Sequence, residues 1–231
     1  MSIARLAENL ESVRANIRDA ARRSGRDKSL VTLVAVTKRR SEALVRSLAA
    51  IGVADFGENY PQELWEKVGN LGGLPARWHL IGHLQGNKAK RTLGLVRWIH
   101  GVDSLKLLKL LDGMASDMDA PPKVCLQLNA SNEVSKHGWT PEGMLADADA
   151  IAACKAIPIV GLMTMAAYGT HAETARPSFV LTRSVRDRLR ERTGLALDHL
   201  SMGMSNDYEA AIEEGATLVR VGSALFEGTE A

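Results

Sequence analysis

The residues of this sequence whose types could act together in chemistry are one lysine and two glycine-containing segments. Lys38 ends the apolar run 30–37, and the segments 201–205 and 220–223 lie near the C-terminus. Glycines in such segments let backbone N–H groups approach a phosphate closely. A lysine after a strand commonly does no more than solvate a loop. Next to a phosphate-binding loop, however, a primary amine indicates pyridoxal phosphate as the ligand.

The elements that must position these residues are an N-terminal helix followed by alternating strands and helices. Apolar residues at Ile3, Leu6, Leu10, Val13 and Ile17 predict an amphipathic helix that ends near residue 24. Strands are predicted at 30–38, 55–59, 77–84, 97–103, 122–130, 158–166, 198–204 and 217–224. Helices are predicted at 41–51, 60–69, 86–95, 104–116, 140–155, 173–193 and 206–214, several opened by a capping residue: Ser41, Ser104, Thr140 and Ser205.

The alternation predicts an α/β fold, a (β/α)₈ TIM barrel with an extra N-terminal helix. No Pro-rich or low-complexity segment interrupts it, so we expect a single domain over 1–231. Such barrels place their site at the C-terminal ends of the strands. The residues at the C-terminal ends of the predicted strands include Lys38, Glu58, Asn59, Tyr60, His83, Asp103, Ser104, Asn129, Thr164 and Met165. Each polar residue among them is also what an ordinary turn contains.

Arg220 lies two residues before Gly222 on the last predicted strand, so both face the barrel interior or its rim. A buried arginine needs a partner. That partner is either an acid on a neighbouring strand or a ring nitrogen of a bound cofactor. The loops after strands seven and eight of barrels commonly bind phosphate, and Ser201, Gly203 and Ser223 lie in those loops together with Gly222.

Other classes of site find little support. His79 and His83 are four residues apart in a predicted strand, about 13 Å, which is too far to share one metal ion, although either could line the site. Zinc-type ligand spacings and nucleotide-binding glycine motifs are absent, so the sequence predicts no metal site. The basic segment 88–91 lacks aromatic neighbours, which is typical of a solvated helix face.

Composition narrows the partner to a small molecule. The 231 residues are 45% hydrophobic and 24% charged with a net charge of +2, which gives no electrostatic case for nucleic acid or a membrane. Cys125 and Cys154 stand apart in or beside apolar stretches, as buried thiols of a reducing compartment do. Acidic residues occupy the N-terminal stretch where a signal sequence would lie, so we expect a cytoplasmic protein.

Six ordered segments resemble a known family, the pyridoxal phosphate homeostasis proteins, once labelled proline synthetase co-transcribed. The segments are VAVTK (34–38), FGENY (56–60), HLIGHLQ (79–85), GLMTM (161–165), LSMGMS (200–205) and VRVG (219–222). They span nearly the whole chain in order. The resemblance implies a fold-type III barrel similar to the N-terminal domain of alanine racemase.

The resemblance also implies roles for individual residues. Lys38 would hold pyridoxal 5'-phosphate as a Schiff base, and Arg220 would face the pyridine nitrogen. The remaining cofactor contacts would be Ser201, Gly222 and Ser223 at the phosphate and Asn59, Met163 and Met202 beside the ring. The chain departs from the family pattern at Pro61, Gly86 and Gly101, which concerns local loop shape rather than cofactor binding.

These features favour a protein that captures the cofactor and buffers or delivers it. A protonated arginine at the pyridine nitrogen makes the ring a poor electron sink. The chain ends after the last barrel unit, whereas the resemblance implies that alanine racemase takes its second base from a further domain; Tyr60, His83 and Tyr168 are the candidates here. The alternatives are a racemase or lyase, and a barrel for another phosphate in which Lys38 forms an ion pair. We expect a monomer that has cofactor-requiring apoenzymes as recipients.

Overall fold

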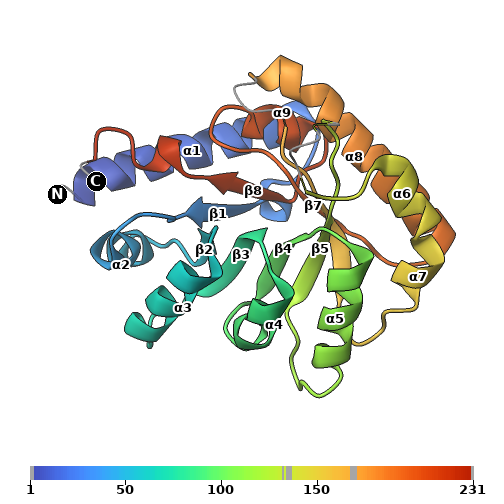
Figure 1. Ribbon diagram of the computed structural model, residues 1–231. Helices are drawn as coiled ribbons and strands as arrows, with labels where there is room; N and C mark the ends of the chain where they lie inside the picture. Colours follow the sequence, from blue (N-terminus) through green and yellow to red (C-terminus); the bar gives the residue numbers. More distant parts are fainter. Residues whose placement is uncertain (1–2, 132, 134–136, 167–170, 230–231) are drawn as a thin grey trace.

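The computed structural model describes residues 3–131, 133, 137–166 and 171–229, which form a closed barrel of eight parallel strands (Figure 1). The strand order follows the sequence, and β8 pairs with β1 to close the ring. The strands are β1 (Thr32–Val36), β2 (Asp55–Glu58), β3 (Arg77–His83), β4 (Trp98–Val102), β5 (Lys123–Gln127), β6 (Ile159–Met163), β7 (His199–Ser201) and β8 (Leu218–Val221). The predicted TIM barrel is confirmed.

Helices connect successive strands around the outside of the barrel (Figure 1). They are α2 (Glu42–Ala50), α3 (Pro61–Asn70), α4 (Gly86–Leu93), α5 (Leu105–Ala115), α6 (Pro141–Ala146), α7 (Ala148–Ala152), α8 (Ala172–Thr193) and α9 (Tyr208–Glu213). The predicted extra helix is α1 (Ile3–Arg23), which packs beside α9. None of the helices in the described ranges has both the length and the apolar character of a membrane span.

The apolar face of α1 is close to the predicted one. Leu6, Leu10, Val13 and Ile17 are buried, whereas Ile3 is 53% exposed, so the buried stripe begins one turn later than predicted. This face packs against the larger of two apolar clusters, which fills the space between the helices and the barrel wall. Burial of one face is what stabilises an amphipathic helix against a domain.

Three of the four predicted helix caps are confirmed. The side-chain oxygens of Ser41, Ser104 and Thr140 each accept a hydrogen bond from the backbone N–H three residues later. These bonds satisfy N–H groups that have no partner inside the helix. The fourth prediction was wrong, because α9 begins at Tyr208 and Ser205 lies outside it.

Two predicted boundaries differ from the structure. The predicted helix 140–155 is broken into α6 and α7 at Asp147, whose Oδ2 accepts a hydrogen bond from Trp139 Nε1 at 2.8 Å. The predicted first strand begins too early, because Leu30 belongs to the 3₁₀ helix η1 (Lys28–Leu30). Asp27 caps that turn by accepting a hydrogen bond from Ser29 N at 2.8 Å.

A second, smaller apolar cluster fills the inside of the barrel. Its buried members come from β1, β3, β4, β5, β6 and β8: Val34, Ile81, Trp98, Cys125, Met163 and Leu218. Cys125 and Cys154 are both buried free thiols, as predicted. Burial raises the pKa of the Cys125 thiol to about 12, against the opposing charge of Arg220. This thiol is therefore neutral and acts as an apolar filler of the barrel.

Closure of the barrel requires glycine where β6 meets β7. Gly161 pairs with His199, and a Cβ atom on Gly161 would lie 1.9 Å from the His199 carbonyl oxygen. A side chain there would collide with backbone, which cannot rotate away as a flexible side chain can. The two strands can approach each other in this register only without that Cβ.

Gly161→Ala should therefore lower the free energy of unfolding by about 3 kcal/mol, the upper part of the range for overpacking. The control is Gly113→Ala in α5, where nothing lies within 4 Å of the added Cβ. That change should raise the free energy of unfolding by about 0.5–1 kcal/mol through helix propensity. Urea unfolding followed by circular dichroism measures both, and similar effects of the two changes would contradict the role of Gly161.

Candidate functional site

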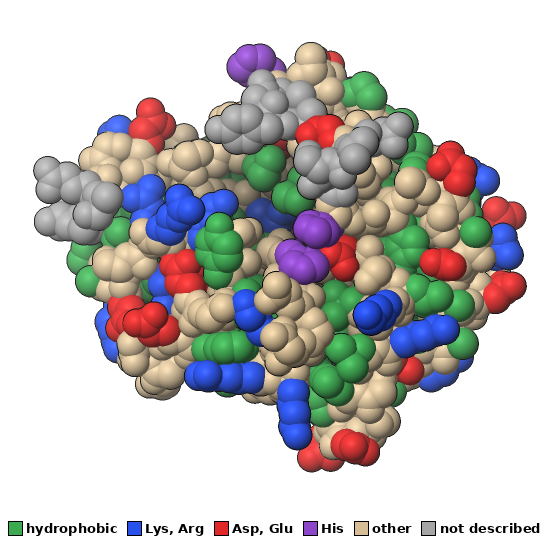
Figure 2. Space-filling view, viewed as in Figure 1, with side chains coloured by type: hydrophobic (Ala, Val, Ile, Leu, Met, Phe, Trp, Pro, Cys, Tyr) green, Lys and Arg blue, Asp and Glu red, His purple; other side chains and the backbone are tan. Residues whose placement is uncertain are grey.

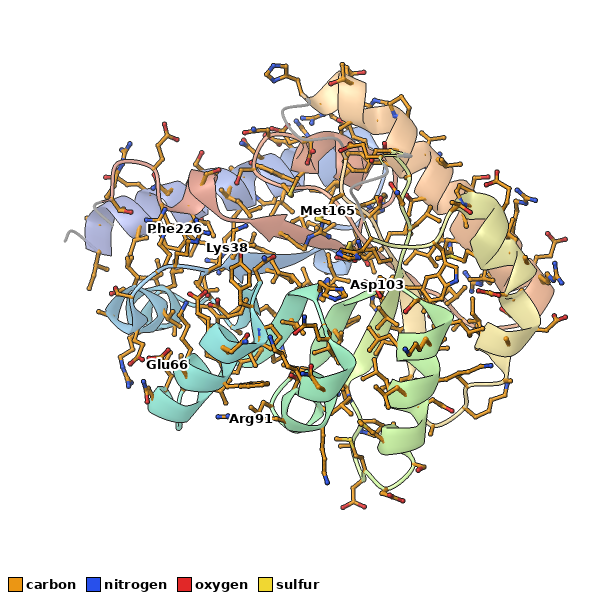
Figure 3. The ribbon with its side chains drawn as sticks, in the orientation of Figure 1. Lys38, Glu66, Arg91, Asp103, Met165 and Phe226 are labelled. Atoms are coloured by element: carbon orange, nitrogen blue, oxygen red, sulfur yellow. The ribbon has the colours of Figure 1, made fainter. Side chains whose placement is uncertain are left out.

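Lys38 lies at the C-terminal mouth of the barrel, in the turn directly after β1 (Figure 3). The next residue, Arg39, has a positive φ of 59°, so the chain reverses sharply after the lysine. The Lys38 side chain is exposed, and within the described part of the chain it makes no hydrogen bond or ion pair. The amine is thus free of the ion pair that a purely structural lysine would form.

A buried network fixes the backbone of this turn. Thr37 Oγ1 donates to Glu58 Oε1 at 2.6 Å, and Lys67 Nζ donates to Thr37 O at 2.6 Å and to Glu58 Oε1 at 2.8 Å. On the other side, Arg39 N donates to Glu63 Oε1 at 2.5 Å. Because Lys67 also binds Glu63 at 2.8 Å, one ammonium holds both acids that anchor the turn.

Glu58 is fully buried, and its charge is partly compensated by these neighbours. Burial raises the pKa of Glu58, while the hydrogen bonds from Lys67 and Thr37 oppose the rise. Among the described residues, its second oxygen, Oε2, has no hydrogen-bond partner. Both of its bonds to Oε1 come from residues that hold the turn, so Glu58 positions Lys38 without contacting its amine.

Arg220 places a cation inside the barrel. Its Nη1 donates to Ser201 Oγ at 2.6 Å and its Nη2 to Thr164 O at 2.9 Å. Burial lowers the pKa of Arg220 to about 10, so the guanidinium stays protonated at neutral pH. No carboxylate among the described residues forms an ion pair with it. Of the two partners considered from the sequence, the neighbouring acid is therefore not found.

A chain of hydrogen bonds continues from Arg220 through the barrel, and we call it the interior network. His100 Nδ1 lies 2.6 Å from Ser201 Oγ, His100 Nε2 lies 2.9 Å from His79 Nδ1, and His79 Nε2 lies 3.1 Å from Asp55 Oδ1. Arg77 ends the chain by donating to both oxygens of Asp55, at 2.7 and 2.6 Å. Its members are Arg220, Ser201, His100, His79, Asp55 and Arg77.

The positions of the protons in the interior network follow from its neutral histidines and its ionised aspartate. Burial lowers the pKa of His79 and holds that of His100 well below its usual range, so both rings are neutral. Asp55 is ionised and only accepts, so His79 Nε2 carries the proton and its Nδ1 accepts from His100 Nε2. His100 Nδ1 then accepts from the Ser201 hydroxyl. Every hydrogen bond along the chain from Arg220 to Asp55 therefore points toward Asp55.

Two predicted phosphate-binding residues, Gly222 and Ser223, lie in the turn after β8. Gly222 precedes the 3₁₀ helix η2 (Ser223–Leu225), and Ser223 is exposed at its first position. Sequence reasoning missed Ser205, whose Oγ accepts hydrogen bonds from Gly222 N and Ala224 N, both at 3.3 Å. The signal for Ser205 was present in the glycine-containing segment 201–205, but we predicted a helix cap there.

Ser201, the last residue of β7, is fully buried and is hydrogen-bonded to both Arg220 and His100. Its hydroxyl hydrogen is directed at His100, so its role at a phosphate has no support from this geometry and stays a prediction. Met163 lies in the interior cluster, whereas Met202 packs in the larger cluster outside the barrel wall. Contacts of these two methionines with a cofactor ring also stay predictions.

Asn59 lies half-buried at the end of β2, against Gly82 of β3. A Cβ atom on Gly82 would be 2.1 Å from the Asn59 carbonyl oxygen and 2.9 Å from Oδ1. The absence of that Cβ brings the Asn59 side chain against the backbone of the next strand. Pro61, one of the departures from the family pattern, is the first residue of α3, where proline is well tolerated.

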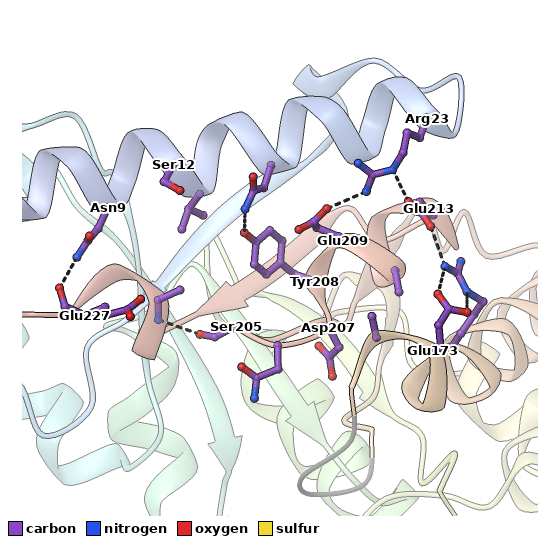
Figure 4. A pocket seen from close by; sticks show the side chains of 17 residues that line it. Asn9, Ser12, Arg23, Glu173, Ser205, Asp207, Tyr208, Glu209, Glu213 and Glu227 are labelled. Atoms are coloured by element: carbon purple, nitrogen blue, oxygen red, sulfur yellow. Dashed lines mark hydrogen bonds and ion pairs between the residues drawn. The ribbon is translucent and has the colours of Figure 1, made fainter.

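A polar cavity of about 460 Å³ adjoins the turn after β8, between α1, α8 and α9 (Figure 4). Ser205 and Ala224 line one side of it. Across the cavity, Arg23 of α1 forms ion pairs with Glu209 at 2.8 Å and Glu213 at 2.7 Å. These bonds fasten α1 to α9 next to the loops that follow β7 and β8.

The donor set at the mouth suits pyridoxal phosphate. An aldehyde requires a primary amine, which Lys38 offers without a competing partner. A phosphate requires backbone N–H groups at a helical turn. At the start of η2, Gly222 N and Ala224 N both donate to the Ser205 hydroxyl at 3.3 Å, and a phosphate oxygen would take the place of that hydroxyl. A pyridine ring nitrogen that accepts a hydrogen bond requires a donor, and Arg220 keeps its charge in the interior of the barrel.

Comparison with known proteins places this barrel in a family. Residues 9–230 match the family model described as alanine racemase, N-terminal domain. An alanine racemase from Clostridium difficile has a TM-score of 0.76 at 15% identity, covering 99% of this chain and 58% of that one, which shows a shared fold. The class of protein is thus the alanine racemase type of barrel.

Relatives with higher sequence identity identify the family within this class. The pyridoxal phosphate homeostasis protein of Pseudomonas aeruginosa is 42% identical over 96% of this chain and 94% of its own, and that of Escherichia coli K12 is 36% identical over 96% and 95%. PipY of Synechococcus elongatus, solved with PLP bound, has a TM-score of 0.84 at 37% identity over 96% of this chain and 99% of its own. The chain belongs to the pyridoxal phosphate homeostasis protein family.

The interior network gives a test through Asp55. Burial would raise the pKa of Asp55, but hydrogen bonds from His79 and Arg77 outweigh it and lower the pKa to about 2. The unfolded value is about 4, so this stabilisation is present above about pH 4 and is lost as the pH falls toward about 2. Asp55→Asn should lower the free energy of unfolding at neutral pH by about 2 kcal/mol.

Chemical unfolding at several pH values measures this effect. The difference in the free energy of unfolding between Asp55→Asn and the parent protein should shrink as the pH falls from about 4 toward about 2. Asp119→Asn, at an exposed carboxylate, is the control and should change little at any pH. A difference that stays constant down to the acid limit would contradict the lowered pKa.

Proposed function

We propose that this protein binds pyridoxal 5'-phosphate through a Schiff base on Lys38 and takes part in its homeostasis by buffering and delivering it. The observation that supports this most is the exposed, unpartnered Lys38 amine at the mouth of a barrel that also holds Arg220 and η2. The names of the relatives and the PLP bound in PipY support the same cofactor. The whole chain, 1–231, would act as one cofactor-binding domain.

The chain's own residues favour holding the cofactor over reacting with it. The bound cofactor supplies an aldehyde that condenses reversibly with amines. Lys38 would hold the cofactor, and Arg220 would offer a permanent N–H donor to its ring nitrogen. The Ser201 hydroxyl accepts a hydrogen bond from the guanidinium and so fixes its position. Because Arg220 keeps its proton, it leaves the ring nitrogen unprotonated, which weakens carbanion stabilisation. The site therefore suits capture and release.

The candidates for a second catalytic base do not separate the carrier from a racemase, because a histidine bound to an aspartate is also the arrangement of a general base. The His83 Nδ1 is bound to Asp103 Oδ2 at 2.7 Å, and the Tyr60 side chain is 46% exposed. Tyr168 lies outside the described residues.

Two buried free thiols support a reducing, cytoplasmic setting. The monomeric state and the recipient apoenzymes stay predictions.

Lys38→Ala should abolish the covalent attachment of the cofactor. We expect the purified parent protein with pyridoxal phosphate to be yellow and to lose its visible band on borohydride reduction, with the added mass on the peptide that contains Lys38. Lys155→Ala, at an exposed lysine before β6, is the matched control and should behave as the parent does. Reduction that labels Lys38→Ala as fully as the parent would overturn the assignment.

Delivery and catalysis are separated by two assays on the same preparation. The loaded protein should restore activity to a cofactor-requiring apoenzyme, and the borohydride-reduced protein should not, because its cofactor is fixed. With alanine as the substrate in deuterated water, racemisation should not exceed that given by free pyridoxal phosphate. Turnover well above that level, lost in Lys38→Ala, would favour the racemase alternative.

A further inference from the structure

Two histidines and one aspartate from three separate elements meet at the mouth of the barrel. His83 is the last residue of β3, Asp103 follows β4, and His137 lies two residues before Trp139, which bridges to Leu128 directly after β5. His83 Nδ1 lies 2.7 Å and His137 Nδ1 lies 3.7 Å from the same oxygen, Asp103 Oδ2. The two rings stack with their centroids 4.4 Å apart. Figure 2 shows two neighbouring histidines at the centre of this face, beside an acidic side chain.

Close backbone contacts bring the first two of these residues together. His83 pairs with Gly101 across β3 and β4, after an irregularity in the register. A Cβ atom on Gly101 would lie 2.6 Å from the Gly82 carbonyl oxygen. The missing side chains at Gly82 and Gly101 therefore let the ends of β3 and β4 approach each other, which sets His83 beside Asp103.

The third residue is held by the end of β5. Gln127 Nε2 donates to the His137 carbonyl oxygen at 2.8 Å. The following residue, Gly138, has a φ of +117°, and a Cβ atom there would lie 2.7 Å from the Gln127 carbonyl oxygen. These contacts fix the His137 carbonyl and the backbone at Gly138, and the His137 imidazole lies beside Asp103 and stacks on His83.

We propose that His83, Asp103 and His137 bind one divalent transition-metal ion, with Zn²⁺ as the representative ion. Each side chain offers one ligand atom, and these atoms all lie within 4.8 Å of one another. With metal bonds near 2 Å, two ligands of a tetrahedral ion are about 3.3 Å apart. The observed 2.7 and 3.7 Å lie on either side of that distance, so small side-chain rotations suffice.

The type of ligand sets the type of ion. Imidazole nitrogens with one carboxylate oxygen suit Zn²⁺, Co²⁺ and Ni²⁺ rather than the all-oxygen shells that Mg²⁺ and Ca²⁺ prefer. When His83 Nδ1 binds the ion, the single proton of the neutral imidazole lies on Nε2, and the Asp103 carboxylate faces a cation in place of the His83 ring nitrogen. The sequence predicted no metal site. Its local patterns offered only His79 and His83 on one strand and no zinc-type ligand spacing, whereas these three ligands come from separate elements.

The exposure of the ligands indicates an open site. The Asp103 side chain is 8% exposed, whereas those of His83 and His137 are 42% and 64% exposed. The acid therefore forms the floor, and the remaining coordination positions face water, as in sites that accept an external ligand. None of the three ligand residues is Lys38 or a member of the interior network, so the inference does not rest on the proposed function.

Cobalt is the probe, because Co²⁺ bound by nitrogen ligands at low coordination number gives visible bands that aqueous Co²⁺ lacks. Titration of the cofactor-loaded protein with Co²⁺ should give saturable bands at one ion per chain, and Zn²⁺ should displace them. His83→Ala, Asp103→Asn and His137→Ala should each weaken binding at least about tenfold. His171→Ala, at an exposed histidine outside the cluster, should bind as the parent does.

Tests of folding and two further variants make the outcome decisive. Far-ultraviolet circular dichroism and thermal unfolding of each variant verify that it is folded, and His137→Gln provides a second, milder change. Lys38→Ala should keep the Co²⁺ bands, because Lys38 is not one of the proposed ligands. Absence of saturable bands, binding by the three ligand variants as tight as that of the parent, or loss of the bands in Lys38→Ala alone would overturn the proposal.

Discussion

A buried guanidinium is the interaction on which the interior of this barrel depends. Arg220 is 4% exposed and has no carboxylate partner among the described residues, yet its pKa of about 10 keeps it charged at neutral pH. A buried charge without compensation is costly, so its hydrogen bonds must be satisfied by other means. The Thr164 carbonyl and the Ser201 hydroxyl do so, and each is fixed by the neighbouring strands.

Charge compensation at the mouth follows the same principle near β1 and β2, beside the strand that carries Arg220. Lys67 forms ion pairs with both Glu58 and Glu63, and both acids hold the turn that contains Lys38. The turn is thereby rigid while the Lys38 amine stays unpaired. A rigid backbone with a free nucleophilic side chain suits a lysine that must accept and release a ligand without reorganising its surroundings.

The sequence predicted the architecture well because alternation of strand and helix is a local signal. Every predicted strand was found, and the cap residues Ser41 and Ser104 do what their local pattern indicates. The helix break at Asp147 was missed because it depends on the indole of Trp139, which no local periodicity reveals.

Contacts between strands account for most of what the sequence could not show of the site. His79 and His100 touch only because β3 and β4 pair in a register that no single segment encodes. A histidine at 100 within an otherwise apolar strand was a signal of an interior polar contact, but its partner could not be named. The same holds for His137, which reaches Asp103 only through the loop after β5.

The uniform direction of the interior network has an electrostatic consequence. Each O–H or N–H bond on the path from Arg220 to Asp55 points toward Asp55, so the dipoles of these bonds add rather than cancel. The network is the side-chain counterpart of a helix macrodipole, with its negative end at the guanidinium and its positive end at the carboxylate. The buried guanidinium of Arg220 and the buried carboxylate of Asp55 thus stabilise each other through the hydrogen bonds between them, without touching.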